Sequence, residues 1–257
     1  MTLQILISTM NQTDHSLLEK MNIQSDAIVV NQCDHNEIAR FTYNGHNILW
    51  MSLNERGVGL SRNTALMRAT ADIILFSDED VKYKDGYAET IKSAFENNKN
   101  AGMLLFDLEA IGEMKHPEKP YTFRRVKWYK SMHYGAVHFA CKRERVLEKG
   151  LTFNLLFGGG AKYSCGEDSI FLAGALKAGL KVWTIPGFIG TVTHGDSTWF
   201  NGYTDKYFYD KGVLMGTIFG VMAYPLVVAL FLKNTGQTKD YGLKKAIGRA
   251  FKGIKQR

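Results

Sequence analysis

The sequence is poor in cysteine and proline, with three cysteines and four prolines among 257 residues. Cys33, Cys141 and Cys165 form no Cys-x-x-Cys pair and no zinc-binding spacing, and an odd number of cysteines argues against a disulfide scaffold. We therefore expect the chain to work in a reducing compartment. The first residues carry no basic segment and only a short apolar run, so no signal peptide is expected.

Internal repeats and low-complexity segments are also absent from the sequence. Apolar residues make up 45% of the chain, which excludes disorder over its whole length. The length suits one large α/β domain, or a catalytic domain with an appendage, because single cores stop growing near ~250–300 residues.

Excess charge is missing from most of the chain. Residues 1–232 hold 24 basic and 24 acidic residues, whereas residues 233–257 hold eight Lys or Arg and a single acid. The net charge of +7 thus belongs to the C-terminal end. A basic groove for nucleic acid is not indicated, and we expect no nucleic-acid partner.

Short apolar runs alternate with helical periodicity along the first two thirds of the chain. We expect strands at residues 3–8, 27–31, 48–51, 73–77, 102–106, 136–141, 181–185 and 190–193, and helices near residues 16–21, 60–71, 85–97 and 143–149 and from residue 167. Between residues 107 and 135 the periodicity fades, which predicts a loop or hairpin over one sheet edge. Apolar strands between helices predict a doubly wound, mostly parallel sheet in an α/β fold.

The C-terminal region has a different pattern. Residues 213–232 contain no charge and could span a ~30 Å hydrocarbon core. A single crossing would put the basic tail outside, against the positive-inside rule, so we expect a helix or helix pair broken near Pro225 in the cytoplasmic leaflet. In residues 243–254 apolar side chains share one helical face and cations the other, which predicts a helix on an anionic membrane surface. The alternative is a helix packed on the protein itself.

Three consecutive carboxylates, Asp78-Glu79-Asp80, directly follow the expected strand at 73–77. In open α/β sheets ligands bind beyond the carboxyl ends of strands. Neighbouring carboxylates repel one another, and Mg²⁺ or Mn²⁺ prefers such oxygen ligands. The triplet therefore indicates a metal site, with a solvated acidic turn as the alternative.

A second acidic pair, Glu167-Asp168, stands at an expected helix start, where the helix dipole stabilises negative charge. The run Gly158-Gly159-Gly160 precedes it and allows a ligand to approach the backbone closely. Simple N-capping explains one acid, but it explains an adjacent pair behind three glycines less well.

Three motifs in order carry a family resemblance: Asn-Glu-Arg-Gly-Val-Gly-Leu-Ser-Arg-Asn at residues 54–63, the Asp-x-Asp of Asp78 and Asp80, and Glu167-Asp168. Over roughly residues 3–195 the chain resembles the family 2 glycosyltransferases, which have the GT-A fold. The resemblance implies an inverting enzyme that moves a sugar from a nucleotide diphosphate to a hydroxyl group.

The resemblance also implies roles for single residues. Donor contacts would come from Ser8 and Thr9 to the base, Arg62 near the nucleotide and Asp78 at the ribose. The DXD motif, Asp78 and Asp80, would hold a divalent cation, Mg or Mn, at the diphosphate. Asp168 would be the catalytic base, with Glu167 orienting the acceptor or the base.

Other assignments are more open. Many members of the family hold uridine with an acidic pair after the second strand, whereas this chain has Asn31-Gln32, whose amides could still bind a pyrimidine edge. His194 is a candidate third metal ligand or diphosphate contact, or a structural histidine. Gly159, Gly160 and Trp128 are candidate acceptor contacts, although a solvated loop is the alternative for the basic segment around Trp128.

The sequence thus predicts a GT-A catalytic domain at 1–200, with a nucleotide-sugar half at about 1–107 and an acceptor half at about 108–200. Residues 201–257 would form membrane-associating helices. The expected reaction transfers a hexose from a nucleotide diphosphate, expected to be a UDP-sugar, to a lipid-linked saccharide in surface-polysaccharide assembly, on the cytoplasmic face of the cell membrane. Two alternatives are a metal-dependent nucleotidyltransferase, which typically needs a glycine-rich loop absent after the first strand, and a non-catalytic membrane-associated partner subunit. The sugar, the linkage, the choice of metal and the oligomeric state are not specified.

Overall fold

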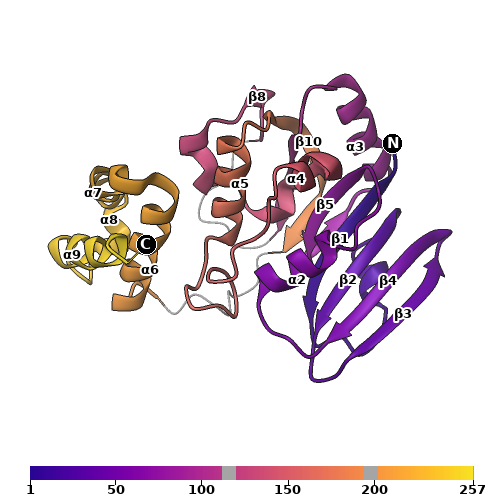
Figure 1. Cartoon of the computed structure of the whole chain (residues 1–257), viewed down its shortest axis with the longest axis horizontal. Coiled ribbons are helices and arrows are strands. Elements are labelled where there is room, and N and C mark those ends of the chain that lie inside the picture. The colour runs from indigo at the N-terminus through magenta and orange to yellow at the C-terminus, as the bar shows by residue number, and fades with distance from the viewer. Residues whose placement is uncertain (112–119, 194–201, 257) are drawn as a thin grey trace.

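The computed structural model describes residues 1–111, 120–193 and 202–256. A twisted sheet with helices on both faces forms the larger part of the molecule, and the C-terminal helices form a separate lobe beside it (Figure 1). The predicted domain boundary near residue 200 falls outside the described residues.

One ten-stranded sheet runs through the larger part, in the order β3-β4-β2-β1-β5-β9-β7-β10-β6, with β8 paired to β10. Its strands are β1 (Leu3–Met10), β2 (Asp26–Gln32), β3 (Glu37–Tyr43), β4 (His46–Leu53), β5 (Ile73–Asp78), β6 (Val81–Tyr83), β7 (Met103–Ile111), β8 (Arg124–Arg125), β9 (Phe139–Lys142) and β10 (Val182–Thr193). The pairings make β4, β2, β1, β5, β7 and β10 run in one direction. The expectation of a mostly parallel α/β sheet is confirmed.

The strand order puts the polar strand ends at one edge. Ser8, near the end of β1, lies opposite Val30 of β2 on one side and Asp78 of β5 on the other. Because parallel strands share direction, the segments that follow β1, β2, β4 and β5 all leave the sheet at the same edge. This edge is where the sequence places most of its candidate site residues.

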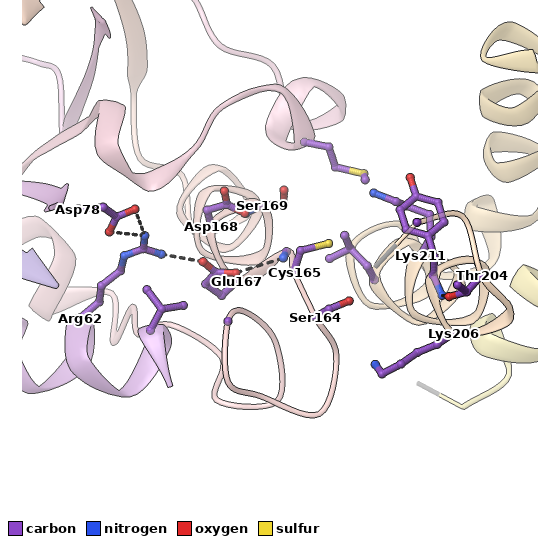
Figure 2. A pocket seen from close by; sticks show the side chains of 17 residues that line it. Arg62, Asp78, Ser164, Cys165, Glu167, Asp168, Ser169, Thr204, Lys206 and Lys211 are labelled. Atoms are coloured by element: carbon purple, nitrogen blue, oxygen red, sulfur yellow. Dashed lines mark hydrogen bonds and ion pairs between the residues drawn. The ribbon is translucent and has the colours of Figure 1, made fainter. Parts of the chain in front are cut away.

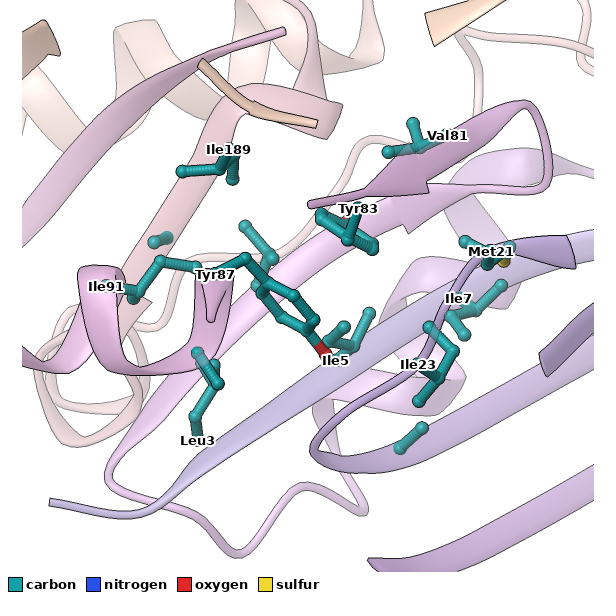
Figure 3. Close-up of a cluster of buried hydrophobic side chains, with 14 of the residues drawn as sticks. Leu3, Ile5, Ile7, Met21, Ile23, Val81, Tyr83, Tyr87, Ile91 and Ile189 are labelled. Atoms are coloured by element: carbon teal, nitrogen blue, oxygen red, sulfur yellow. The ribbon is translucent and has the colours of Figure 1, made fainter. Parts of the chain in front are cut away.

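Two buried apolar clusters hold the sheet between helices. The helices of this part are α1 (Leu17–Lys20), α2 (Val58–Leu66), α3 (Tyr87–Asn97), α4 (Arg143–Glu148) and α5 (Glu167–Lys177), with 3₁₀ turns at Trp128–His133 and Ala136–His138. On one face α3 packs Tyr87 and Ile91 against Leu3 and Ile5 of β1 (Figure 3). On the other face α2, α4 and α5 cover Leu6 and the alternate residues of the same strands. Covering both faces explains why the parallel strands are continuously apolar.

Three segments differ from the sequence prediction. β3 was not predicted, although Asn44 and Gly45, both with positive φ, form the tight turn that joins it to β4. The strands expected at 181–185 and 190–193 are one strand, β10, whose register shifts around Pro186-Gly187. The strand expected at 136–141 begins only at Phe139, after a 3₁₀ turn.

The C-terminal lobe consists of α6 (Asp205–Phe219), α7 (Ala223–Lys233), α8 (Thr235–Thr238) and α9 (Leu243–Ile254). The helix break falls at Gly220, with φ 61°, and a 3₁₀ turn at Gly220–Met222, not near Pro225. Pro225 is accommodated because it lies in the first turn of α7, where a backbone N–H has no intrahelical partner. The expected helix pair therefore exists, but the glycine breaks it.

One stretch in the described residues, Asp205–Lys233, is long and apolar enough to cross a membrane by length and composition, and 39% of its most apolar window is buried within the protein. α9 buries Ala246, Ala250 and Ile254 against α6 and α7. The face of α9 that was expected to enter a membrane therefore packs on the protein, which is the alternative that the sequence had left open. Lys244, Lys245 and Lys252 of α9 are exposed, whereas Arg249 pairs with Asp205 of α6 at 3.3 Å.

The contact between α6 and α9 depends on glycine. A Cβ atom at Gly212 would lie 2.0 Å from the Ala250 carbonyl oxygen, and one at Gly253 would lie 2.2 Å from the Tyr209 carbonyl oxygen. Small residues on both helices let the two backbones approach this closely, as in small-xxx-small helix pairs. Gly212, directly before the apolar stretch, and Gly253 of α9 therefore allow α9 to pack closely against α6.

We predict that Gly212→Ala destabilises the protein by about 1–3 kcal/mol, because the added methyl group forces the two helices apart. Gly248→Ala is the matched control, since Gly248 lies on the open side of α9 with no atom within 4 Å of the new Cβ. The control should be neutral or stabilising by up to ~1 kcal/mol from helix propensity. Urea unfolding measures both changes, and equal stability of the two variants would contradict the close contact.

Candidate active site

A cavity of about 490 Å³ opens at the sheet edge where the strands end. Three distant segments line it: α2 and the end of β5, the glycine-rich loop with the start of α5, and the first turns of α6 (Figure 2). Both acidic motifs contribute, through Asp78 on one side and Glu167 and Asp168 in the centre. The fold thus brings two acidic groups that lie about ninety residues apart in sequence to one cavity.

Arg62 connects the two acidic motifs. Its Nη2 atom donates to both carboxylate oxygens of Asp78 at 2.9 Å, and its Nη1 atom donates to Glu167 Oε1 at 2.7 Å. The Arg62 side chain is only 4% exposed, and those of Asp78 and Glu167 are 34% and 10% exposed. A single buried cation therefore fixes the distance between β5 and the start of α5.

The charge of Arg62 is secured by these partners. Burial alone would lower the pKa of the guanidinium, but the charges of Asp78 and Glu167 and the hydrogen bonds to Asp78 raise it above its ordinary value. The Arg62 guanidinium carbon also lies 5.3 Å from the centre of the Phe153 ring, which stacks on Phe171. The Arg62 guanidinium thus packs on the face of a stacked aromatic pair, Phe153 and Phe171.

The residue after Arg62 holds the glycine-rich loop. Asn63 donates from Nδ2 to the Phe153 carbonyl oxygen at 2.9 Å and accepts the Phe153 N–H at 2.8 Å. Further along the loop, Gly158 has φ 105°, and a Cβ there would lie 2.8 Å from Glu167 Oε2. Gly158 is therefore required by both its backbone conformation and the close approach of Glu167.

Asp168 has the electrostatics of a proton acceptor. Burial and then the charge of Glu167 raise its pKa to about 6, while the charge of Arg62 and the Ser169 N–H, which donates to Oδ1 at 2.6 Å, oppose the rise. A carboxylate with a pKa near 6 is a stronger base than an ordinary aspartate and is still ionised at neutral pH. Of the two acids at the start of α5, Arg62 binds Glu167, and Asp168 faces the cavity.

The middle acid of the triplet, Glu79, takes a separate role. Its carboxylate accepts the Thr9 hydroxyl, the Met10 N–H at 3.2 Å and the Gln12 amide at 3.1 Å. Glu79 thereby fixes the segment that follows β1. The predicted donor residue Thr9 is 2% exposed, and its hydroxyl is bound to Glu79 in this structure.

Asn31 and Gln32 differ in how their amides are used. Asn31 is fully buried and bonds the backbone of Gln12 through both amide atoms, and it also donates to the Ser52 hydroxyl. Gln32 Oε1 accepts the Gly57 N–H at 2.7 Å at the start of α2. Asn31 thus positions the segment after β1, whereas Gln32 links the end of β2 to α2, close to Arg62 along the chain.

Two polar atoms at this edge have no hydrogen-bond partner within the described residues. They are the Ser8 hydroxyl, in a residue only 6% exposed, and Nε of Arg62. Buried polar groups without a hydrogen-bond partner are uncommon in folded proteins. Two such groups close to the same sheet edge are therefore consistent with a ligand site.

The predicted metal ligands are only partly described. Asp80 is exposed and lies outside the residues that line the cavity, and its carbonyl oxygen accepts the Thr193 N–H at 3.1 Å, so β10 ends beside it. His194 lies outside the described residues. Within the described part of the chain the one group of three close ligand side chains is Cys33, Asp34 and His35, which line a second cavity of about 620 Å³. The oxygen donors of Asp78 and Asp80 nevertheless fit the chemistry of Mg²⁺ or Mn²⁺.

The three predicted acceptor residues separate in space. Gly159 lines the cavity and its carbonyl oxygen accepts the Val58 N–H at 3.1 Å. Gly160 packs on the backbone of Gly57 instead. Trp128 is 46% exposed and contacts Phe219 across a separate hollow next to the end of α6.

The sequence interpretation missed the contribution of α6. Its N-terminal turns line the cavity with side chains from residues not singled out before: Thr204, Lys206, Tyr207, Lys211 and Leu214. The available signal was weak, since it consisted of two lysines just before an apolar run.

Comparison with known proteins places this geometry in context. The profile described as glycosyl transferase family 2 matches residues 9–151. A search of curated proteins found no match.

Solved structures of S. aureus TarS share the fold. The 1–349 fragment in complex with UDP-GlcNAc has a TM-score of 0.62 at 16% identity, over 86% of this chain and 67% of that chain. The same fragment with UDP gives 0.59 at 15% identity, over 86% and 66%. A longer TarS structure gives 0.60 at 14% identity, over 84% of this chain but only 39% of that one. The chain thus spans about two thirds of the TarS fragment.

We predict that Arg62→Met destabilises the protein by about 3–5 kcal/mol, because it leaves the buried Glu167 carboxylate and the partly exposed Asp78 carboxylate without their cation. Arg68→Met is the matched control: Arg68 follows the same helix, is exposed, and donates only to the Thr64 carbonyl oxygen. The control should change stability by less than about 0.5 kcal/mol. Urea unfolding at pH 7.5 compares the variants, and a small loss in Arg62→Met would show that the bridge is not structurally important.

Proposed function

This chain belongs to glycosyl transferase family 2, and from that premise we propose that it moves a sugar, as a hexosyl group, from a UDP-sugar to an acceptor hydroxyl with inversion at the anomeric carbon. The observation that carries the proposal is the shared cavity in which Arg62 joins Asp78 to Glu167, with Asp168 facing the space between. The TarS structures with UDP and UDP-GlcNAc support a uridine donor by similarity of fold.

The donor would lie along the ends of β1, β2 and β5. Ser8 is suited to a donor contact because its buried hydroxyl has no partner in the described structure. Both residues are buried, but Asn31 uses its amide oxygen and its amide nitrogen inside the protein, whereas Gln32 uses its oxygen, which accepts the Gly57 N–H. We therefore assign the pyrimidine contact to Gln32 and a positioning role to Asn31. Asp78, fixed by Arg62, would bind the ribose.

A divalent cation, Mg or Mn, would be held by Asp80 and Asp78, with His194 as a further candidate ligand. When bound, such a cation neutralises charge on the leaving diphosphate. The charge of Asp78 is already balanced by Arg62, so Asp80 would provide most of the ligand charge.

The acceptor hydroxyl would be activated by Asp168. Its carboxylate takes the hydroxyl proton while the acceptor oxygen bonds to the anomeric carbon. At the same time the bond from that carbon to the diphosphate breaks, and the diphosphate leaves with the electron pair. Such proton transfer contributes typically ~10²–10⁴-fold to the rate. Glu167 raises the basicity of Asp168 through its charge and holds Arg62 in place.

The alternatives fit less well. Membership of the family favours glycosyl transfer over nucleotidyl transfer. A non-catalytic subunit does not require a carboxylate with a raised pKa in the cavity. Asp168, whose pKa is raised to about 6, is such a carboxylate and favours a catalytic role.

We further propose that the protein works at the cytoplasmic membrane surface on a lipid-linked saccharide, as in surface-polysaccharide assembly. α7 and the turn before it expose apolar residues, with Val221 67%, Met222 55% and Leu232 56% exposed. Exposed lysines of the tail, among them Lys233 and Lys239, flank this surface and complement anionic lipid. The contact is assigned to α7, because the apolar face of α9 is buried.

Donor binding and transfer can be tested separately. We expect a UDP-sugar with Mg²⁺ or Mn²⁺ to raise the melting temperature of the wild type and of Asp168→Asn, but to raise that of Asp80→Ala much less. Sugar transfer by Asp168→Asn should fall by ~10²–10⁴-fold, because the base is lost. Stabilisation of Asp80→Ala equal to that of the wild type, or near-normal transfer by Asp168→Asn, would count against the proposal.

The pH dependence gives a second test of the base. Because Asp168 must be ionised and its pKa is raised to about 6, kcat/KM should rise through pH 6 and level off above pH 7. Glu167→Gln removes a charge that raises this pKa, so the rising limb should move to lower pH. A limb that Glu167→Gln leaves in place would exclude Asp168 as the titrating group.

Membrane binding is tested by co-sedimentation with vesicles of phosphatidylcholine, with and without phosphatidylglycerol. We expect binding to the anionic vesicles and a loss of about tenfold in Leu232→Asp. Leu155→Asp is the matched control, because Leu155 is also 56% exposed but lies in the glycine-rich loop region. Equal binding by both variants would show that α7 is not the membrane contact.

A further inference from the structure

The side of the cavity formed by α6 is cationic. Lys206 and Lys211 both line it, and in the view of Figure 2 Asp168 lies between Lys211 and the Arg62–Asp78 pair. The donor contacts proposed above belong to the Asp78 side. The two lysines therefore face the space that remains for the acceptor.

Lys206 is already used within the protein. Its ammonium group pairs with Asp210, a residue only 4% exposed, and donates to the Lys162 carbonyl oxygen at 2.9 Å. Asp210 also accepts the Ser164 N–H at 3.2 Å and the Ser164 hydroxyl at 3.1 Å. Lys206 and Asp210 thus hold the glycine-rich loop against α6, which is a structural role.

Lys211, in contrast to Lys206, has no acidic partner within the described residues. Its side chain is half-buried, and within the described residues no carboxylate lies within ion-pair distance of its ammonium group. The Nζ atom lies 5.6 Å from the centre of the Tyr207 ring, which stabilises a cation weakly. An ammonium group in a cavity wall without a carboxylate partner is available to pair with an anionic ligand.

Lys211 also lies within electrostatic reach of the catalytic side. Burial raises the pKa of the Cys165 thiol, and the charge of Lys211 opposes this rise while that of Asp168 adds to it. Lys211, Cys165 and Asp168 therefore share one electrostatic environment inside the cavity.

We propose that Lys211 binds a phosphate group carried by the acceptor, next to the hydroxyl that receives the sugar. This inference rests on the proposed glycosyl transfer and narrows its acceptor to phosphate-bearing compounds. A phosphate oxygen suits a lysine ammonium, which acts as a compact point charge. The phosphate could belong to a lipid carrier or to a soluble polyol phosphate, since both present the same chemistry. In either case Lys211 holds the anion, and Asp168 remains available for the hydroxyl proton.

The test uses the full chain saturated with UDP, so that the donor site is occupied. Decyl phosphate, glycerol 3-phosphate, decyl maltoside and decanoate are titrated by calorimetry below their micellar concentrations. We expect at least one phosphate probe to bind and to lose at least tenfold in affinity in Lys211→Gln, with recovery in Lys211→Arg. Lys149→Gln, an exposed change directly after α4 and away from the cavity, is the matched control and should bind like the wild type.

The outcomes distinguish a lipid-linked from a soluble phosphate. They also distinguish failure of the Lys211 inference from failure of the proposed function. Tighter binding of decyl phosphate than of glycerol 3-phosphate assigns a lipid-linked phosphate, and similar binding assigns a soluble one. If Lys211→Gln binds the phosphate probes as the wild type does, or if decanoate or decyl maltoside shows the same dependence on Lys211, the inference is wrong. Wild-type protein that fails to bind UDP would overturn the proposed function instead. Melting curves of each variant establish that it is folded.

Discussion

The buried bridge made by Arg62 is the interaction on which the cavity depends. It joins a strand end of the first half of the chain, at Asp78, to a helix start of the second half, at Glu167. Because Arg62 and Glu167 are largely removed from water, the cation needs its two acids and each acid needs the cation. The same bridge separates the roles of the adjacent acids. Glu167 is held by Arg62, and Asp168 is left to face the cavity with a raised pKa.

Glycines make this arrangement possible both next to the acidic residues and further away, between the C-terminal helices. Gly158 leaves room for the Glu167 carboxylate, and Gly166 leaves room for Leu214 of α6, which would lie 2.5 Å from a Cβ there. α6 in turn packs on α9 through Gly212 and Gly253. The C-terminal lobe is therefore in direct contact with the turn that starts α5. It contributes a wall of the cavity as well as the apolar surface proposed to meet the membrane.

The acidic triplet shows how neighbouring residues of one type divide between functions. Asp78 is fixed by Arg62, Glu79 turns back to the segment after β1, and Asp80 remains exposed beside the end of β10. Only Asp78 belongs to β5, whereas Glu79 and Asp80 form the turn before β6, so three consecutive carboxylates need not form one site. A similar division applies to Asn31 and Gln32, which are both buried: the first bonds the backbone of Gln12 and the second bonds the start of α2.

The sequence by itself determined the α/β class, the positions of most strands along the chain and the two acidic motifs. Apolar periodicity and polar strand ends are local properties, so they can be recognised without the fold. It could also have shown β3 through Asn44-Gly45. Only the tertiary structure decided that Arg62 joins the motifs, that Glu79 leaves the cavity, that α9 packs on α6, and that Lys211 lines the same cavity as Asp168. Each of these depends on contacts between residues far apart in the chain, and a hydrophobic pattern records that a face is buried but not what covers it.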